Sequence, residues 1–174
     1  NRPTQEELAK RKAEQEQAAK ANNPQNNAAT AATADLGAFA YSNAQPTAKD
    51  GVTVIENKDV KLTINNKGGD LKEVLLKQFK TYESMPVYLI KDKNAIFALN
   101  FKTTQGQELN TQQLYFEPSL SQKDGKQLLS MKVKTGENSY LEYVYTLPAE
   151  GYMVDVAVRS QGLSGVLNSQ NPIE

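Results

Sequence analysis

The chain has 174 residues, of which 20 are basic and 20 acidic, so its formal net charge is zero. This balance leaves no basic field to hold a phosphate backbone, and nucleic acid is not an expected partner. The sequence contains no His and no Cys, which excludes disulfides, thiol nucleophiles and His-dependent catalysis. No apolar run is long enough to cross a bilayer. The length suits one globular domain with an additional segment.

The first fifty residues are predicted to form a polar helix and a linker. Thr4 and Glu7 make a capping box behind Pro3, and residues 5–21 are almost all strong helix formers. Leu8 is the only large apolar residue in this run, so the helix has no apolar stripe to bury. We interpret it as a solvated spacer; an amphipathic membrane-surface helix is the weaker alternative.

Residues 22–50 are low in charge and rich in Asn, Ala and Thr, which is typical of a flexible linker. Phe39 and Tyr41 are the residues that could dock onto the following domain, as a short strand. Residues 1 to about 45 are expected to pack little. The predicted division is therefore a helix and linker over 1–50 and a β-domain over 51–174.

The clearest pattern in the chain is a strand, a turn and a second segment between Asp59 and Leu76. Val60, Leu62 and Ile64 alternate with polar residues, which predicts a half-buried strand. Residues 65–70 then form a turn, in which Gly68 and Gly69 supply positive φ without a Cβ clash.

The segment Leu71–Phe79 fits two patterns when it is considered alone. Leu71, Val74 and Leu75 have helical spacing behind a potential Asp70 N-cap, whereas Leu71, Glu73 and Leu75 alternate as in a strand. The segments around it decide in favour of a strand, because they are all short, rich in β-branched and aromatic residues, and separated by turn signals.

These neighbouring segments predict an all-β fold. The predicted strands are Val52–Glu56, Pro86–Ile90, Ala95–Lys102, Gln113–Glu117, Leu128–Lys134, Tyr140–Leu147 and Tyr152–Arg159. Their regular spacing favours an antiparallel β-sandwich. Two apolar faces should lie in its core, one made by Leu141, Tyr143, Tyr145 and Leu147, the other by Tyr152, Val154, Val156 and Val158. The residues expected to be buried are Leu62, Ile64, Leu75, Tyr143, Tyr145, Val154 and Val156.

The search for chemistry predicts no catalytic, metal-binding or cofactor-binding residue, and it identifies no binding residue. Most of the carboxylates considered lie at turns or on the polar face of a strand, where they are interpreted as solvated and not as a catalytic pair: Glu56, Asp59, Asp70, Glu73, Glu83, Asp92, Glu108, Glu117, Asp124, Glu142 and Asp155. The Gly68-Gly69 pair is followed by an acid and not by Lys-Ser or Lys-Thr, so it is no phosphate loop. The eight Tyr favour core packing over sugar stacking.

A resemblance to a known family rests on three stretches: VTVIEN, VKLTINNKGGDLKEVLLKQF and SYLEYVYTLPAEGYMVDVAV. They resemble the first large extracytoplasmic domain of the YidC membrane-protein insertases, and the N-terminus is similar to Bacteroidetes members just after their first transmembrane helix. The resemblance implies a galactose-mutarotase-like supersandwich that continues beyond this chain. It also implies a location on the periplasmic side of the inner membrane, with a transmembrane anchor before Asn1.

The resemblance implies an accessory domain that binds and does not catalyse, because the insertase activity belongs to a transmembrane core that is not in this chain. Its expected partners are Sec translocon components and emerging membrane proteins, contacted through a groove or an open sheet edge. The alternatives are a mutarotase-like carbohydrate-active protein, which the absence of His disfavours, and a periplasmic glycan-binding module or adhesin. Because a sheet edge with unpaired N–H and C=O groups can pair with another strand, we further expect the chain to self-associate by strand pairing near its C-terminal strands.

Overall fold

The computed structural model describes residues 35–168, so the predicted helix over residues 5–21 lies outside the described residues. A compact unit begins at Gly37. It opens with the 3-10 turn η1 (Gly37–Phe39) and the single-turn helix α3 (Ala40–Asn43), and a later 3-10 turn, η2, spans Thr111–Gln113. Within the described range, no helical segment has the length and apolar character of a membrane span.

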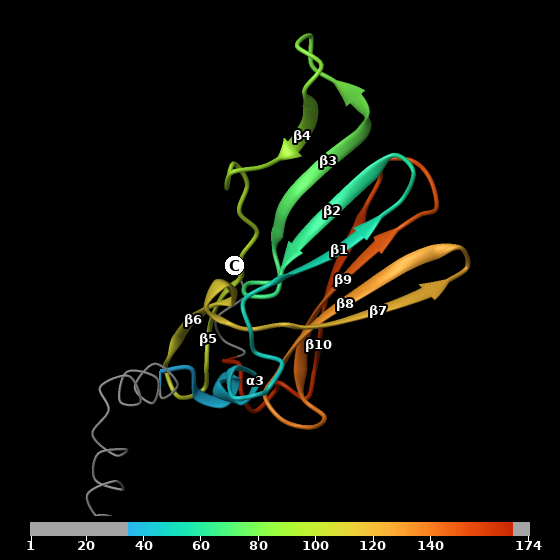
Figure 1. The fold of residues 1–174 in the computed structure, drawn as a ribbon. Helices are drawn as coiled ribbons and strands as arrows, with labels where there is room; N and C mark the ends of the chain where they lie inside the picture. The colour runs from blue at the N-terminus through green and yellow to red at the C-terminus, as the bar shows by residue number, and fades with distance from the viewer. Residues whose placement is uncertain (1–34, 169–174) are drawn as a thin grey trace, which may run out of the picture. The chain divides into compact units, whose positions relative to one another are not determined.

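Two four-stranded antiparallel sheets form a β-sandwich, which confirms the predicted fold class (Figure 1). The first sheet has the order β1-β2-β3-β4, with the strands Val52–Glu56, Val60–Asn65, Leu71–Lys80 and Pro86–Ile90. The second has the order β10-β9-β8-β7, with β7 over Glu117–Lys123, β8 over Lys126–Lys134, β9 over Tyr140–Leu147 and β10 over Asp155–Gln161. A small third sheet pairs β5 (Asn100–Lys102) with β6 (Glu108–Asn110).

The core lies between the two large sheets and contains four of the residues predicted to be buried. Leu62 and Ile64 of β2 and Tyr143 and Tyr145 of β9 are each at most 1% exposed. The Phe116 ring stacks on Tyr143, with 4.9 Å between the ring centroids. Alternation along β2 and β9 therefore identified the two faces that meet, because in a strand every second side chain points to the same side.

Three residues expected in the core are not fully buried. Val156 is 46% exposed and Val154 is half-buried. Val156 lies opposite Tyr145 in the sheet register and so faces the inner side, but β10 is an edge strand and its inner face is only partly covered. Leu75 is also half-buried, because the strand partners place Val74 opposite the buried Leu62 and turn Leu75 to the other face.

The second predicted core face, on β10 and the residues before it, faces the inner side but is not buried as expected. Tyr152 and Val158 are each 44% exposed, and every residue of β10 is exposed. The face on β9 is confirmed, since Leu141 and Leu147 are buried with the two tyrosines between them. Periodicity shows which side of a strand is apolar, but it does not show whether a second sheet reaches over that side.

The predicted strand bounds hold where alternation is strong. Val52–Glu56, Pro86–Ile90 and Tyr140–Leu147 match β1, β4 and β9, and the ambiguous Leu71–Phe79 segment is strand β3. The strand predicted over Ala95–Lys102 is reduced to β5, because residues 95–99 cross from one sheet region to another without a partner strand.

Two further differences concern residues 108–123. The predicted strand Gln113–Glu117 is wrong, since η2 ends at Gln113 and β7 begins only at Glu117. Strands β6 and β7 were not predicted, because ELN and EPSLSQK lack the β-branched alternation that marks a half-buried strand.

The segment from Gly37 to Asn43 packs onto the domain, which corrects the expectation of little packing before residue 45. Phe39 is fully buried, and its ring centroid lies 5.0 Å from that of Phe101. The Ser42 hydroxyl donates to the carbonyl of Tyr115 at 2.7 Å. The expected docking of Phe39 is therefore found in a helical turn and not in a strand, while Tyr41 is 39% exposed.

Candidate functional site

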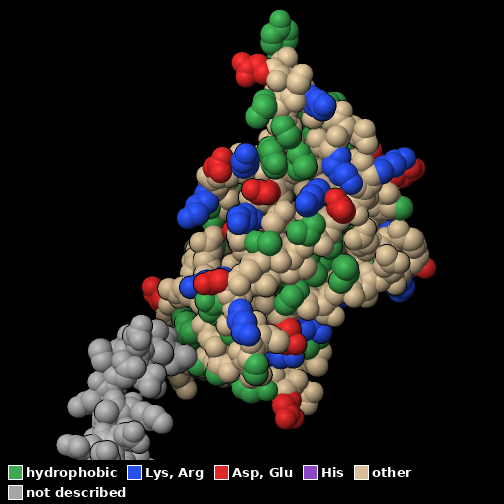
Figure 2. Space-filling view, in the orientation of Figure 1, with side chains coloured by type: hydrophobic (Ala, Val, Ile, Leu, Met, Phe, Trp, Pro, Cys, Tyr) green, Lys and Arg blue, Asp and Glu red, His purple; other side chains and the backbone are tan. Residues whose placement is uncertain are grey.

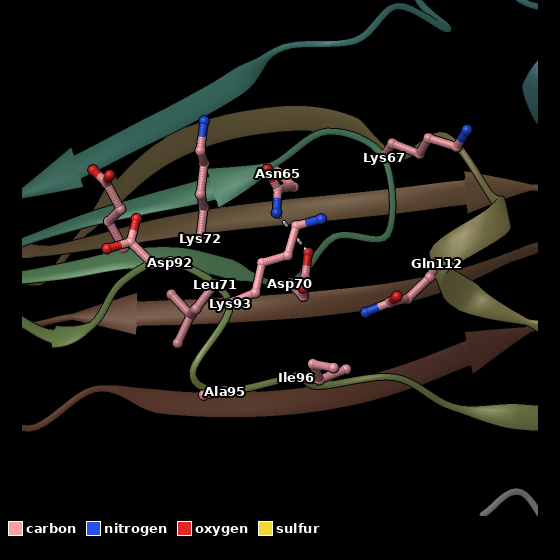
Figure 3. A pocket seen from close by; sticks show the side chains of 11 residues that line it. Asn65, Lys67, Asp70, Leu71, Lys72, Asp92, Lys93, Ala95, Ile96 and Gln112 are labelled. Atoms are coloured by element: carbon pink, nitrogen blue, oxygen red, sulfur yellow. Dashed lines mark hydrogen bonds between the residues drawn. The ribbon is translucent and has the colours of Figure 1, made fainter.

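A cleft of about 400 Å³ opens beside the glycine turn between β2 and β3 (Figure 3). One wall is the turn with the start of β3, the other is the connection after β4, and η2 closes one end. The residues that line the cleft are Asn65, Lys67, Asp70, Leu71, Lys72, Glu73, Asp92, Lys93, Ala95, Ile96 and Gln112. They come from three segments that are separated in the sequence.

The glycine turn is the rigid wall of the cleft. Gly68 and Gly69 have φ of 91° and 68°, which confirms the prediction that both positions need the left-handed region. The Asn65 side chain donates to the Asp70 carboxylate at 2.9 Å, and the Asn65 N–H donates to the Asp70 carbonyl at 2.9 Å. These bonds hold the buried Asp70 in place, so the turn has one defined shape.

Hydrogen bonds also join this turn to residues of the sandwich core. The Tyr145 hydroxyl donates to the Gly69 carbonyl at 2.6 Å, and the Gly68 N–H donates to the carbonyl of Leu114 at 2.9 Å. The Phe116 N–H donates to the Asn66 carbonyl at 2.8 Å. Burial raises the pKa of Tyr145 well above its usual value, so this hydroxyl keeps its proton and remains a donor.

The opposite wall, residues 91–97, is held by local hydrogen bonds of the Asn94 side chain and by one aromatic contact. Asn94 accepts from the N–H of Lys91 at 2.9 Å and donates to the carbonyl of Leu89 at 3.2 Å. Phe97 anchors the segment, with its ring centroid 5.2 Å from that of Tyr143. Ile96 is 71% exposed, so this wall presents an apolar side chain to the cleft and to solvent.

The short turn η2 forms the end of the cleft and is fixed by its neighbours. The Asn110 side chain accepts from the N–H of Gln112 at 2.8 Å, which caps the turn. Thr111 is fully buried, and its hydroxyl accepts from the N–H of Leu99 at 3.0 Å. Gln112 is thereby directed along the cleft while its backbone stays in place (Figure 3).

The charges that line the cleft are balanced in number but not in exposure. Lys67, Lys72 and Lys93 are exposed, whereas of the three carboxylates only Asp92 is exposed, Asp70 being buried and Glu73 half-buried. Across the face seen in Figure 2, basic and acidic side chains are interspersed and do not gather by sign. The cleft therefore presents accessible cations next to apolar Ile96, without a large positive field.

The solvated interpretation of the carboxylates is wrong at two positions. Asp70 is 9% exposed and bound by Asn65, and Glu142 on β9 is 8% exposed. Glu142 accepts from the Ser130 hydroxyl and lies 3.7 Å from the Lys132 ammonium group. Both carboxylates are thus hydrogen-bonded by neighbouring side chains, which is the usual condition for burying a charge.

Among residues 35–168, no group of three or more His, Cys, Asp or Glu side chains is arranged to hold a metal ion. The lining residues Lys93 and Ile96 were missed as candidate binding residues. The signal that could have located this wall is Asp92-Lys93-Asn94, which reads as a turn; Asp92 and Lys93 have φ of 53° and 62°. What the sequence did not show is that this turn faces the glycine turn.

Comparison with known proteins identifies the family. The model of the YidC periplasmic domain matches residues 52–172. The membrane protein insertase YidC of Parabacteroides distasonis is 36% identical over 115 residues, which cover 66% of this chain and 18% of that protein. The corresponding protein of Cytophaga hutchinsonii is 34% identical over 113 residues, covering 65% of this chain and 18% of that protein. The protein of Amoebophilus asiaticus is 35% identical, covering 60% and 19%.

No solved structure matches the chain. The chain spans less than a fifth of the length of these curated relatives. The family match covers both sheets of the sandwich, the glycine turn and the wall that carries Ile96. The chain therefore belongs to the YidC periplasmic domain family.

Proposed function

We propose that this chain is the non-catalytic accessory domain of a YidC-type membrane-protein insertase, and that it binds extended polypeptide segments in the cleft beside the glycine turn. The observation that supports the insertase assignment is the family match over residues 52–172. As a periplasmic domain of this family, the chain belongs on the periplasmic side of the inner membrane. Residues 1–50 would connect the domain over 51–174 to a membrane anchor.

The composition of the cleft supports binding over catalysis. The sequence contains no His to act as a general base near neutral pH. The buried Asp70 is engaged by Asn65 on the same turn, so its geometry serves the turn itself. The three exposed lysines can position a ligand by charge.

An extended polypeptide fits the cleft better than a sugar does. Its carboxylate and carbonyl oxygens would meet Lys67, Lys72 and Lys93, and an apolar side chain would lie against Ile96. Within the described part of the chain, none of the residues that line the cleft is aromatic, so a sugar ring would have no face to stack on. The partners that this chemistry suits are emerging membrane-protein segments and exposed strands or loops of Sec translocon components.

The test is an NMR titration of the whole chain with a synthetic extended peptide that alternates Leu with Asp. We expect amide shift changes at Lys93, Ile96 and Gln112, weakened by added salt because the lysines are exposed. Lys93→Glu should weaken binding about five-fold, the scale expected when an exposed attractive pair becomes repulsive.

Lys126→Glu is the matched control, since Lys126 is an exposed lysine on the β7–β8 hairpin and does not line the cleft. It should bind the peptide like the unmodified chain. A panel of free sugars serves as the comparison for the carbohydrate alternative. Sugar-induced shifts at the cleft without any response to the peptide would overturn the proposal.

A further inference from the structure

The first three residues of β3, 71–73, have a partner strand on one side only. On the side of β2, Leu71 lies opposite Ile64. On the other side, pairing begins only at Val74, which lies opposite Ile90, the last residue of β4. Within residues 35–168, no strand pairs with residues 71–73 on this second side. The backbone of β3 therefore presents a short edge that another strand could use.

This edge exists because the chain turns sharply out of the sheet after β4. Asp92 and Lys93 both have positive φ, 53° and 62°, although each carries a Cβ. The Asn94 N–H donates to the Lys91 carbonyl at 3.1 Å, and the Asn94 side chain accepts from the Lys91 N–H at 2.9 Å. Positive φ is unfavourable for such residues and is common at binding sites. A strained turn thus carries the chain away from the position that a longer β4 would occupy.

The edge faces the cleft and is bounded on its far side by the chain itself. Residues 71–73 of β3 and Ala95 and Ile96 of the opposite wall all line the same cleft (Figure 3). The edge is therefore an internal feature of the region between two described segments, and it does not depend on where the sequence ends. A strand in this space would continue the line of β4, between β3 and the opposite wall.

A β-bulge gives the two faces of this edge different chemistry. Between Thr63 and Ile64 the register with β2 skips Lys72, which is an extra residue of β3. In Figure 3 the Leu71 side chain points toward the opposite wall, whereas the Lys72 side chain points away from it. Bulges are frequent beside functional sites, because they redirect a side chain and interrupt regular pairing. One face of the edge is thus apolar and the other charged.

We propose that an extended polypeptide binds here as an added strand, pairing its backbone with residues 71–73 of β3 in the line of β4. This inference rests on the proposed function of the cleft and specifies how the polypeptide is held. Alternate side chains of the added strand would lie against Leu71 and Ile96, and the others near Lys72 and Glu73. In such a site, backbone hydrogen bonds supply affinity and alternate side chains supply selectivity.

The ligand class follows from this geometry. Three residues of a strand span about 10 Å, so a short unpaired segment is enough to fill the edge. The segment should alternate apolar and charged residues, because successive side chains of a strand point to opposite faces. The expected ligand is therefore an amphipathic strand of an incompletely folded polypeptide, and not one fixed sequence motif.

The test compares two N-methylated forms of the alternating Leu-Asp peptide in NMR titrations of the whole chain. One form is methylated at the backbone nitrogen of every Leu, the other at that of every Asp. Alternate residues of a strand direct their N–H groups to the same edge, so each form blocks one edge of the peptide. We expect one form to bind like the unmodified peptide and the other to bind about ten-fold or more weakly.

The two forms control for each other, because both carry the same kind of modification. Which of them loses binding shows whether the added strand runs parallel or antiparallel to β3. Similar binding of the two forms, whether strong or weak, would overturn strand addition and leave the cleft as a polypeptide site. If the unmodified peptide causes no shifts in the cleft, the proposed function fails, and this inference fails with it.

Amide hydrogen exchange gives a second readout on the protein itself. Saturation with the unmodified peptide should slow exchange at one or more amides of residues 71–73 by about five-fold or more, since an added strand would engage them. Residues 74–76 are the internal control and should change little, because they already pair with both β2 and β4. Unchanged exchange at residues 71–73 while the peptide is bound would contradict backbone pairing.

Discussion

The two walls of the cleft are held in different ways. The glycine turn is bound to the sandwich core through Tyr145, Leu114 and Phe116, and its own Asn65–Asp70 bonds complete the support. The opposite wall depends on the local bonds of Asn94 and on one aromatic anchor, Phe97. The glycine turn is therefore bonded to the core of the sandwich, whereas the opposite wall is held by local contacts and a single ring.

Because the two walls are held differently, substitutions in them should affect different properties of the domain. Substitutions in the glycine turn should lower the free energy of unfolding, because they disturb contacts that join the two sheets. Substitutions at the tip of the other wall should leave stability nearly unchanged and alter only what the cleft binds, since exposed residues away from special features contribute little to stability.

The largest expected effect is that of Gly69→Ala. A Cβ at this position would lie 3.0 Å from Tyr143 Cδ2 and 3.1 Å from Phe116 Cδ1, on a backbone with φ of 68°. The positive φ costs about 1 kcal/mol and overpacking adds about 1–3 kcal/mol, so we expect a loss of about 2–4 kcal/mol in a denaturant melt.

Gly125→Ala is the control for this prediction. Gly125 has a similar φ of 73°, but nothing lies within 4 Å of its added Cβ. It should therefore show the backbone cost alone, about 1 kcal/mol. Equal losses for the two variants would show that the glycine turn is not pressed against the core.

The second prediction concerns high pH. Burial raises the pKa of Tyr143 to about 12, and it also raises the pKa of Tyr145. A raised pKa means that the folded state favours the protonated phenol, so this stability is fully present below the unfolded pKa near 10 and is lost as pH rises through the folded value.

The Tyr143 phenol alone should lower stability by about 2 kcal/mol between pH 10 and pH 12, at 1.36 kcal/mol for each pKa unit, and the Tyr145 phenol should add to that loss in unfolding melts. The Tyr143→Phe variant should lose less over the same interval, because one of the two phenols is gone. An unchanged pH profile in that variant would contradict the burial argument.

A third, smaller effect is expected for Tyr145→Phe. The substitution removes the hydroxyl that donates to the Gly69 carbonyl and leaves that buried acceptor without its partner. The expected loss is about 1–2 kcal/mol, measured by chemical denaturation. Tyr140→Phe is the matched control, since the Tyr140 hydroxyl donates to Gln161 at an exposed position and its removal should be nearly neutral.

The smallest effect on stability is expected at the other wall. Ile96→Ser should change the unfolding free energy by less than about 0.5 kcal/mol, because the side chain is 71% exposed. The same variant should weaken binding of the Leu-Asp peptide, since it removes the apolar contact in the cleft. A large loss of stability would show that this wall is structural like the glycine turn.

Sequence reasoning was most successful where local chemistry decides the structure. The strand Tyr140–Leu147 and the positive φ at Gly68 and Gly69 follow from alternation and from the absence of a Cβ. It failed at Val156 and Val158, where the apolar face is real but the other sheet does not fully cover it. At Phe39 it predicted the docking but not the conformation, since the ring docks from a helical turn and not from a short strand.

The cleft could not be predicted because none of its three segments has a distinctive pattern alone. Asp92-Lys93-Asn94 reads as a turn and Gln112 falls in a polar stretch, and only the sandwich brings them beside the glycine turn. Residues 95–99 were predicted as part of a strand because their composition is apolar, although they form the irregular connection that carries the second wall of the cleft. Long-range placement of this kind depends on tertiary packing and leaves no local trace.

The most direct test of the central claim, that the cleft wall at Ile96 contacts polypeptide, is site-specific photo-cross-linking in a membrane-embedded insertase that carries this domain. A photoreactive residue at position 96 should give adducts with a membrane protein during its insertion. The same residue at Leu120, which is 55% exposed on β7 and outside the cleft, should give few. Equal adduct yields at the two positions, or none at position 96, would contradict the account.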